Sequence, residues 1–280
     1  MRCIVNMENG KELPRSFRTC RLEGSLSVTE QGLAELALSG SGQFSQLGLE
    51  ALLERLEAER QGKPLLIVDL REESHGFVDG TAVSWYQGEK NWGNRGKKRE
   101  QIEEEQAEFL DHSLLAGGLS IYPDKESQEA IDWKVESVSD EAELLASYGL
   151  AYRRLYVTDH RRPDDRAVDE FLALFRLLGK DHWLHFHCGA GKGRTTTFMV
   201  MCDILVNGSK VSFEDILTRQ WLIGGKQLND SSSAPQWKLE AIEERLAFLH
   251  RFYDYVVSQP RLELSWSNWL SLNQPCSTGD

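Results

Sequence analysis

The stretch His185-Phe186-His187-Cys188-Gly189-Ala190-Gly191-Lys192-Gly193-Arg194-Thr195-Thr196-Thr197 decides how this 280-residue chain is interpreted. It follows an apolar run, Trp183 to His187, which predicts a buried strand, and it leads into a second apolar run, Thr195 to Val206, which predicts a helix. Three glycines within five positions let the backbone curl so that successive N–H groups point inward at a helix N-terminus. A turn of this kind binds phosphate.

Cys188 opens this turn, so its sulfur faces inward backbone dipoles and the positive end of the following helix. Such surroundings lower a thiol pKa from about 8.5 to between about 3.5 and 7.5, and the thiolate is the nucleophile. Arg194 can fold back to hold two phosphoryl oxygens, and the Thr195 hydroxyl can donate to the sulfur. We therefore expect these three residues to be catalytic in a two-step phosphocysteine mechanism. The rest of the turn is expected to bind the phosphate: His187, Gly189, Ala190, Gly191, Lys192 and Gly193.

Other interpretations of the same stretch fit less well. A dinucleotide fingerprint has glycines spaced G-x-G-x-x-G, whereas the spacing here is G-x-G-x-G, and a Walker loop needs Gly-Lys followed by Ser or Thr. His185 and His187 alternate onto one strand face and could ligate a metal, but no further His, Cys or Asp has matching spacing, which favours a structural role for His185. A buried, inert thiol is the remaining alternative for Cys188. We expect neither a metal nor a cofactor.

A cysteine phosphatase also needs a carboxylic acid that protonates the leaving alkoxide. Asp159, in Thr158-Asp159-His160-Arg161-Arg162-Pro163, is the candidate. The usual structural role of such an aspartate is helix capping, but Asp164 and Asp165 beside Pro163 already supply negative charge for the next helix start. We therefore expect Asp159 to be catalytic, and His160 either to contact the substrate phosphate or to be a surface histidine.

The rest of the chain alternates between strand-like and helical patterns. This order predicts an α/β fold with a central, mostly parallel sheet flanked by helices and with functional loops at the carboxyl ends of its strands. Residues 76–99 fit the alternation poorly and predict a small β-rich excursion from a single domain that spans 1–280. The expected strands are 64–70 and 152–157, and the expected helices are 48–56, 100–110, one that starts near Ser139, 163–178 and 237–257.

Composition limits the classes of partner. A net charge of −12 disfavours broad contact with nucleic acid or anionic membrane, so an anionic substrate must meet a local basic patch. No apolar run is long enough for a membrane helix and the start of the chain lacks a signal core, so we expect a soluble protein, secreted or periplasmic if a leader has been removed. The five cysteines, Cys3, Cys20, Cys188, Cys202 and Cys276, are scattered and do not predict a disulfide scaffold.

The pattern His187-Cys188-x5-Arg194-Thr195 resembles the signature of protein tyrosine phosphatases and their relatives. More narrowly, the chain resembles the bacterial protein-tyrosine-phosphatase-like phytases, which remove phosphates from myo-inositol hexakisphosphate. Most of the chain takes part in this resemblance. It runs through Leu13-Pro14-Arg15-Ser16-Phe17-Arg18-Thr19, Val68 to Phe77, Val83-Ser84-Trp85-Tyr86, Thr158-Asp159-His160, Trp183 to Cys188, Phe198 to Met201, Phe252 to Val256 and Trp266 to Leu270.

The resemblance implies a phosphatase core with a small β-barrel-like subdomain and a general acid at Asp159. It also implies that Arg18 and His160 bind substrate and that Lys238, beside Trp237, binds a distal phosphate. Two positions depart from the family pattern. Asn91 stands where an aspartate is expected, which puts recognition of the ring hydroxyls or positional preference in doubt. Lys192 within the turn is a feature of inositol-lipid phosphatases.

Charge supports the same substrate class. Phytate carries six phosphates at about −1.5 to −2 each, so only a focused basic pocket could attract it to this acidic chain. We expect hydrolysis of phytate and lower inositol polyphosphates, with a protein tyrosine phosphatase or a phosphoinositide phosphatase as alternatives. A module that only binds inositol phosphates would need neither a thiol nor an acid. The candidates for the basic pocket are Arg15, Arg18, Lys90, Arg95, Lys97, Lys98, Arg161, Arg162, Lys192, Arg194 and Lys238.

Overall fold

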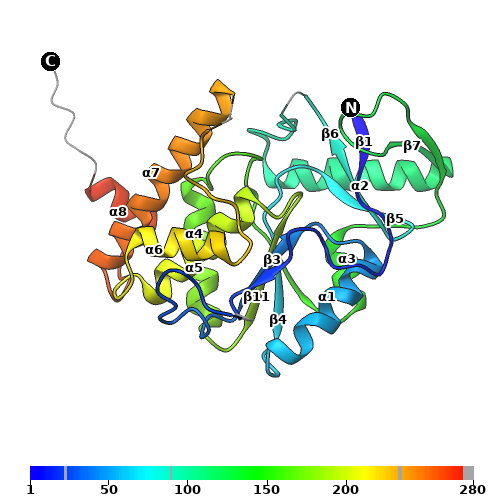
Figure 1. The fold of residues 1–280 in the computed structure, drawn as a ribbon. Helices are drawn as coiled ribbons and strands as arrows, with labels where there is room; N and C mark the ends of the chain where they lie inside the picture. The colour runs from blue at the N-terminus through cyan, green and yellow to red at the C-terminus, as the bar shows by residue number, and fades with distance from the viewer. Residues whose placement is uncertain (22–23, 89, 233–234, 274–280) are drawn as a thin grey trace, which may run out of the picture.

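The computed structural model describes residues 1–21, 24–88, 90–232 and 235–273, so Cys276 lies outside the described residues (Figure 1). The strand that ends in the nucleophile is β11, Trp183–Cys188, and it lies in the middle of a five-stranded sheet. Three of its four pairings are parallel, which confirms the predicted central sheet; only β2 runs antiparallel to its neighbour. The strand order is β10 (Ala151–Arg154), β4 (Leu65–Asp69), β11, β3 (Leu38–Gly42) and β2 (Arg18–Thr19).

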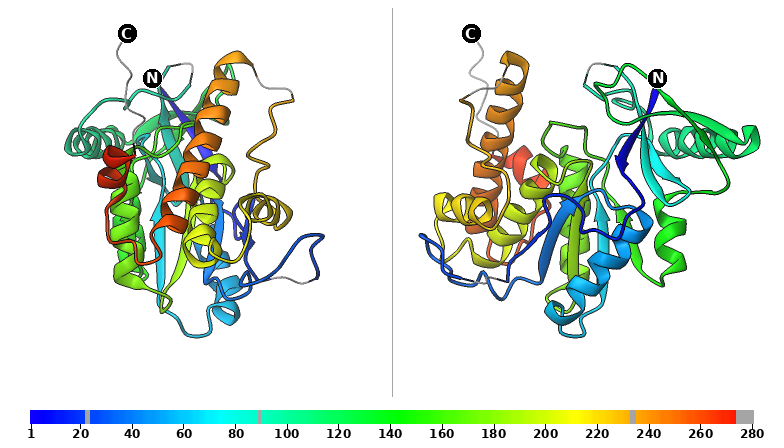
Figure 2. Two further views of the ribbon diagram at one scale, coloured as in Figure 1. Left: turned by 90° about the vertical axis from the view of Figure 1, so that its left-hand side faces the viewer. Right: turned by 45° about the vertical axis from the view of Figure 1, so that its right-hand side comes forward.

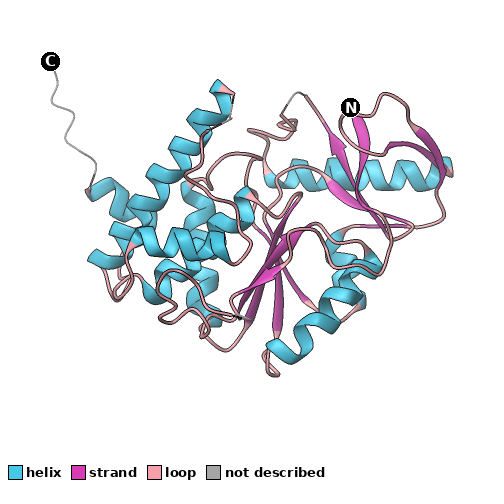
Figure 3. Ribbon diagram, viewed as in Figure 1, coloured by secondary structure: helices cyan, strands magenta, loops and turns pink. Residues whose placement is uncertain are grey.

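Helices cover both faces of this sheet, and its three central strands are buried on both sides (Figure 3). Leu184 and Phe186 of β11 face one layer of helices, and Trp183 faces the other. Phe186 packs with Phe171 and Phe198 at ring-centroid distances of 6.2 and 5.8 Å, which fixes two helices against β11. The first layer holds α4 (Asp165–Leu178), α5 (Gly193–Asn207), α6 (Phe213–Leu222), α7 (Gln236–Ser258) and α8 (Trp266–Leu272); the second holds α1 (Gln46–Glu59) and α3 (Glu141–Ser147).

Helix starts follow the expected chemistry with small shifts. Asp164 caps α4, because its side chain accepts a hydrogen bond of 2.7 Å from the Ala167 backbone N–H, and Asp159 is not part of this cap. The helix expected to start near Ser139 is instead capped by Asp140, and Ser139 ends the short strand β9, Val138–Ser139. The helix expected over 100–110 continues one and a half turns further, as α2, Arg99–Ala116.

A second, six-stranded sheet stands beside these layers, with α2 against it (Figure 2). The expected excursion over 76–99 supplies only two of its strands, so the β-rich part of the fold is larger than predicted. Within the described residues the strand order is open, so the structure does not confirm a barrel. The order is β8 (Ile131–Lys134), β7 (Gly118–Tyr122), β1 (Arg2–Met7), β6 (Thr81–Tyr86), β5 (His75–Val78) and β9.

None of the helices in the described part of the chain combines the length and the apolar character that crossing a bilayer requires. The four cysteines among these residues, Cys3, Cys20, Cys188 and Cys202, are free thiols.

Candidate active site

Cys188 is the last residue of β11, and α5 begins at Gly193, so the predicted strand–turn–helix arrangement is present. The Cys188 side chain lies at the carboxyl end of the sheet and is only 3% exposed. Burial works against ionisation of the thiol, but the charge of Arg194 and hydrogen bonds from the side chain and backbone of Thr195 outweigh it, so the pKa of Cys188 is lower than usual. The Thr195 hydroxyl donates to Cys188 Sγ at 3.3 Å. These contacts therefore stabilise the thiolate form of Cys188.

The loop between Cys188 and α5 is held from outside by its carbonyl groups. Gly189 O accepts hydrogen bonds from Arg15 Nη2 (2.7 Å) and from the Gln43 backbone N–H (3.3 Å). Gly191 O accepts one from Arg18 Nη1 (2.7 Å). In a trans peptide the N–H points opposite to the carbonyl, so the next N–H groups turn to the other side, as an anion nest requires. Gly191 has φ +72° and packs so closely that a Cβ would lie 2.3 Å from Gly42 N, so only glycine fits there.

Three of the residues predicted to bind substrate, Arg18, His187 and Gly191, are not among the residues that line the cavity above Cys188. Arg18 is 4% exposed and lies under the loop, where it also bonds to Ser16 O and Thr196 Oγ1. His187 is turned by the alternation of β11 toward the opposite layer, where its Nε2 donates to Glu141 Oε1 at 2.6 Å. Arg18 therefore braces the loop, and His187 anchors the strand that carries the nucleophile.

We predict that Arg18→Met weakens inhibition by inorganic phosphate about tenfold and lowers the free energy of unfolding by about 1–3 kcal/mol, because Gly191 O loses its partner. Steady-state inhibition and denaturant unfolding measure the two effects. Arg21→Met is the matched control, since Arg21 Nη1 bonds to Ala34 O, away from the loop. If Arg18 contacted only a distal phosphate of the substrate, inhibition by inorganic phosphate would not change.

Arg194 is fixed by carboxylate and carbonyl oxygens. Its Nη1 and Nη2 donate to the two Glu73 oxygens at 2.6 and 2.8 Å, and Nη1 also reaches Leu70 O and Val157 O. Burial opposes the charge on Glu73, but Arg194 and Arg71 outweigh it and hold the Glu73 pKa well below its usual value. Arg194 Nε is buried without a hydrogen-bond partner, so it is free to donate to a phosphoryl oxygen.

The two ends of the catalytic loop are also joined beneath it. A continuous chain of buried hydrogen bonds runs from the residue before the nucleophile to the arginine that closes the loop. Because these buried groups are hydrogen-bonded to one another, the network rigidifies the base of the loop. In order, the members are His187, Glu141, Gln43, Arg71, Glu73 and Arg194.

Asp159 lies on the loop after β10 and borders the same cavity as Cys188. Its Oδ1 lies 3.1 Å from Arg194 Nη2 and accepts a hydrogen bond from the His160 backbone N–H at 2.9 Å. His160 adopts φ +65°, and its ring Nε2 lies 3.4 Å from Asp159 Oδ2. Burial lowers the His160 pKa, and although Asp159 opposes this, the charges of Arg194 and Lys238 add to the lowering, which favours a neutral imidazole at pH 7.

The cavity above Cys188 has a volume of about 370 Å³ and is rich in positive charge. Both sheets contribute to its wall, because Asn6, Ser84 and Tyr86 come from strands of the second sheet. Asn91 also lines it. The cationic lining residues are Arg15, Arg71, Lys125, Lys192, Arg194, Lys226, Lys238 and Arg245.

Sequence reasoning missed four of these residues: Arg71, Lys125, Lys226 and Arg245. Two of them, Arg71 and Arg245, could have been recognised from their positions in the sequence. Arg71 follows the carboxyl end of β4, where ligand-binding residues gather in such sheets. Arg245 lies on the buried face of α7 with Ile242 and Leu249, and an arginine inside an apolar stripe requires a partner or a ligand.

Besides Arg18, six of the predicted basic residues do not line the cavity. Arg161 and Arg162 form ion pairs with Glu244, and Lys97 pairs with Glu105. Lys90 and Arg95 lie over the Trp92 ring, each 5.0 Å from its centroid. Lys98 is the exposed residue before α2.

A second cavity, of about 470 Å³, lies between α2 and α3. Acidic residues dominate its lining, so its field repels phosphate esters. They are Glu103, Glu104, Asp111, Asp140, Glu141 and Glu143. The basic cavity above Cys188 is therefore the candidate site for an anionic substrate.

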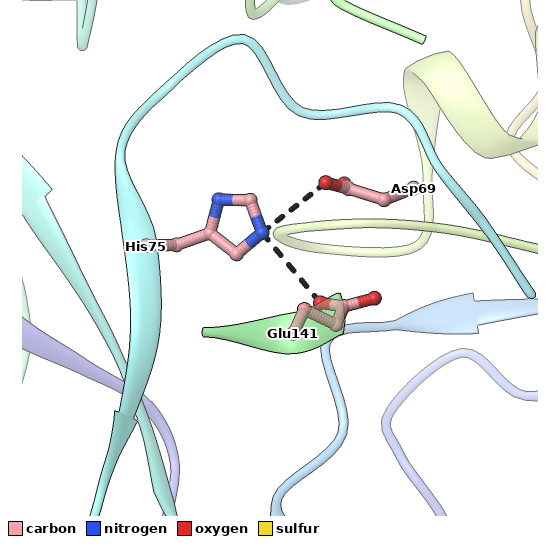
Figure 4. A group of neighbouring side chains, drawn as sticks. All are labelled: Asp69, His75 and Glu141. Atoms are coloured by element: carbon pink, nitrogen blue, oxygen red, sulfur yellow. Dashed lines mark ion pairs between the residues drawn. The ribbon is translucent and has the colours of Figure 1, made fainter. Parts of the chain in front are cut away.

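His185 and His187 of β11 are the two residues that the sequence offered as metal ligands. His185 contacts Ser39 Oγ and Ser41 Oγ at 2.8 and 3.0 Å, a structural role as predicted. Beneath the loop, His75 Nε2 points at Asp69 and Glu141, 3.2 and 3.5 Å away (Figure 4). Ligand atoms of these three residues lie within 4.8 Å of one another.

The two carboxylates of this group already have partners. Asp69 accepts from the Tyr152 hydroxyl and from the Arg71 backbone N–H, and Glu141 accepts from His187 and Gln43. None of Asp69, His75 and Glu141 borders the basic cavity. Asp69 and Glu141 therefore belong to the buried polar network around His187.

The sequence and the fold match one family throughout. The model of the PTP-like phytase family, whose description is "Inositol hexakisphosphate", matches residues 68–206. A PTP-like phytase from Bdellovibrio bacteriovorus is 32% identical, with a TM-score of 0.76 over 96% of this chain and 94% of that one. A PTP-like myo-inositol phosphatase from Mitsuokella multacida, solved with myo-inositol-(1,3,4,5)-tetrakisphosphate, is 36% identical, with a TM-score of 0.89 over 97% of this chain and 48% of that one.

Effector protein hopD2 of Pseudomonas syringae pv. tomato is 31% identical over 253 residues, which are 87% of this chain and 53% of hopD2. The chain thus spans about half the length of hopD2 and of the Mitsuokella protein, but nearly all of the Bdellovibrio phytase. Because it is 32% identical to a PTP-like phytase over 96% of its own length and 94% of that protein's chain, the chain belongs to the family of protein-tyrosine-phosphatase-like phytases.

Proposed function

We propose that this protein hydrolyses phosphomonoesters of inositol polyphosphates, phytate included, through a phosphocysteine intermediate. The observation that carries the proposal is the placement of the Cys188 sulfur beneath a cationic cavity that Asp159 also borders. Because both sheets supply walls of this cavity, we propose that they act as one phosphatase domain. The acidic chain gathers its positive charge here, which supports a small anionic substrate over nucleic acid or an anionic membrane.

Each catalytic residue has a separate role in the reaction. The Cys188 thiolate attacks phosphorus and the bond to the ester oxygen breaks, while Asp159 gives that oxygen its proton. Arg194 Nε and the loop N–H groups stabilise the charge on the transferred phosphoryl group. Water then attacks the phosphocysteine, Asp159 accepts its proton, and the Thr195 hydroxyl stabilises the departing thiolate.

Distal phosphates of the substrate are held by the cavity wall. Lys192, Lys226, Lys238 and Arg245 come from three segments that converge there, and they match a ring bearing several phosphates better than a single phosphotyrosine. The Mitsuokella relative was solved with an inositol tetrakisphosphate, which supports the same class. Lys192 within the loop favours a second candidate, a phosphoinositide.

Substrate comparison tests the proposal. We expect phosphate release from phytate to have a kcat/KM at least about tenfold above that for a phosphotyrosyl peptide or a phosphoinositide, in the presence of EDTA, because only phytate fills the distal positions. Phosphate release and ion chromatography of the products measure the rates. Preference for the peptide or the lipid would overturn the substrate assignment, and a rate abolished by EDTA would overturn the cysteine mechanism.

A further inference from the structure

The loop that carries Asp159 is held by a tryptophan from a different part of the chain. Trp92, on the loop between β6 and α2, donates its indole Nε1–H to the backbone carbonyl of Asp159 at 2.8 Å. The same ring meets the edge of Trp237 of α7, with centroids 6.4 Å apart, and Trp237 meets the edge of His160 at 5.2 Å. Trp92 thus links three segments: its own loop between β6 and α2, helix α7, and the loop that carries Asp159.

Cationic side chains surround the Trp92 ring. Lys90 Nζ lies 5.0 Å from its centroid and 4.5 Å from that of Trp237, and the guanidinium carbons of Arg95 and Arg161 lie 5.0 and 5.8 Å from the Trp92 ring. Contacts of this kind attract the cation to the ring face and keep the ring from turning. The direction of the indole N–H is therefore set before substrate binds.

The opposite side of the same loop is fixed by Arg245. This residue is 5% exposed, and its Nη2 donates to His160 O at 2.7 Å and to Arg161 O at 3.3 Å. The backbone from Asp159 to Arg161 is thus held at three successive carbonyls, and Arg194 Nη2 attracts the Asp159 carboxylate itself at 3.1 Å.

We propose that Trp92 is a positioning residue for proton transfer: by holding the Asp159 carbonyl, its indole N–H places the Asp159 carboxyl over the leaving oxygen. This rests on the proposed function, in which Asp159 is the general acid. A proton donor must lie within hydrogen-bond reach of the leaving oxygen, and a displacement of about 1 Å can cost about 10²-fold in rate. The anchored loop supplies that placement without a closing movement.

Trp92→Phe tests the proposal, because it keeps a ring for Lys90, Arg95 and Trp237 and deletes the N–H. We expect kcat/KM for phytate, which reports only the steps up to departure of the leaving group, to fall about 10- to 100-fold. The kcat/KM for p-nitrophenyl phosphate, whose leaving group needs little protonation, should fall less than about threefold. Equal losses with the two substrates, or no loss with either, would overturn the proposal. A wild-type protein that hydrolyses neither substrate would instead overturn the proposed function.

Two comparisons separate positioning from a general loss of structure. Trp133→Phe is the matched control, since Trp133 in β8 donates its Nε1 to Asp79 Oδ2 at 3.0 Å and does not border the cavity; we expect the phytate-to-nitrophenyl ratio to stay unchanged. In an Asp159→Asn background, Trp92→Phe should cost less than about twofold more with phytate, because it acts through the missing acid. A full additional loss in that background would contradict the proposal.

Discussion

Cys188→Ser is expected to lower phosphate release from phytate by at least about 10⁴-fold, because it removes the nucleophile on which both half-reactions depend. The thiol pKa is lowered at this position, so the wild-type protein has a thiolate at pH values where a serine hydroxyl stays protonated. The same amides and Arg194 remain in the variant, so inorganic phosphate should still bind. Single-turnover phosphate release and calorimetry with inorganic phosphate measure the two quantities.

The other described cysteines provide the control. Burial raises the pKa of Cys3 and of Cys20 to about 12, and it raises that of Cys202 as well. At about pH 6, iodoacetamide should therefore alkylate Cys188 while these three stay unmodified, and inorganic phosphate should protect Cys188. Peptide mapping by mass spectrometry identifies the modified residue. Wild-type turnover by Cys188→Ser would exclude the cysteine mechanism.

The catalytic loop could be predicted from sequence because its chemistry is local. Cys188, the glycines and Arg194 lie in one contiguous run, and the strand and helix on either side have unambiguous apolar patterns. Spacing alone then fixes which atoms can meet. Asp159 could be predicted for a related reason: its loop follows β10 at the same edge of the sheet, and Asp164 caps α4 in its place.

The parts that could not be predicted depend on contacts between distant segments. β1 pairs with β6 and β7, about 80 and 120 residues away, so the second sheet left only short, isolated signals in the sequence. Arg18 is predicted to bind substrate because the family resemblance implies that role. Its burial against Gly191 O is decided by how β2 pairs with β3, which no local pattern reveals.

For the same reason, the sequence predicts only four of the eight cationic residues that line the cavity. The predicted set included Lys90, Arg95 and Arg161, which the structure places around Trp92 rather than at the cavity. The sequence shows that a residue is charged but not where its long side chain points, whereas a buried position restricts that direction. Arg245, inside the apolar face of α7, was the more informative residue.

Asp159→Asn is expected to slow phytate hydrolysis by about 10²- to 10⁴-fold and p-nitrophenyl phosphate hydrolysis by much less, because the nitrophenolate leaves without protonation. The amide keeps the shape of the side chain and can still face Arg194, so the variant tests the proton rather than the packing. Steady-state kcat/KM for the two substrates, which does not include the shared hydrolysis of the phosphocysteine, measures the ratio. Asp164→Asn on the same loop is the matched control, since Asn is as good an N-cap as Asp and should leave that ratio unchanged. Equal losses with both substrates would show that Asp159 holds the site together but does not donate the proton, and the acid would then have to come from another group bordering the cavity.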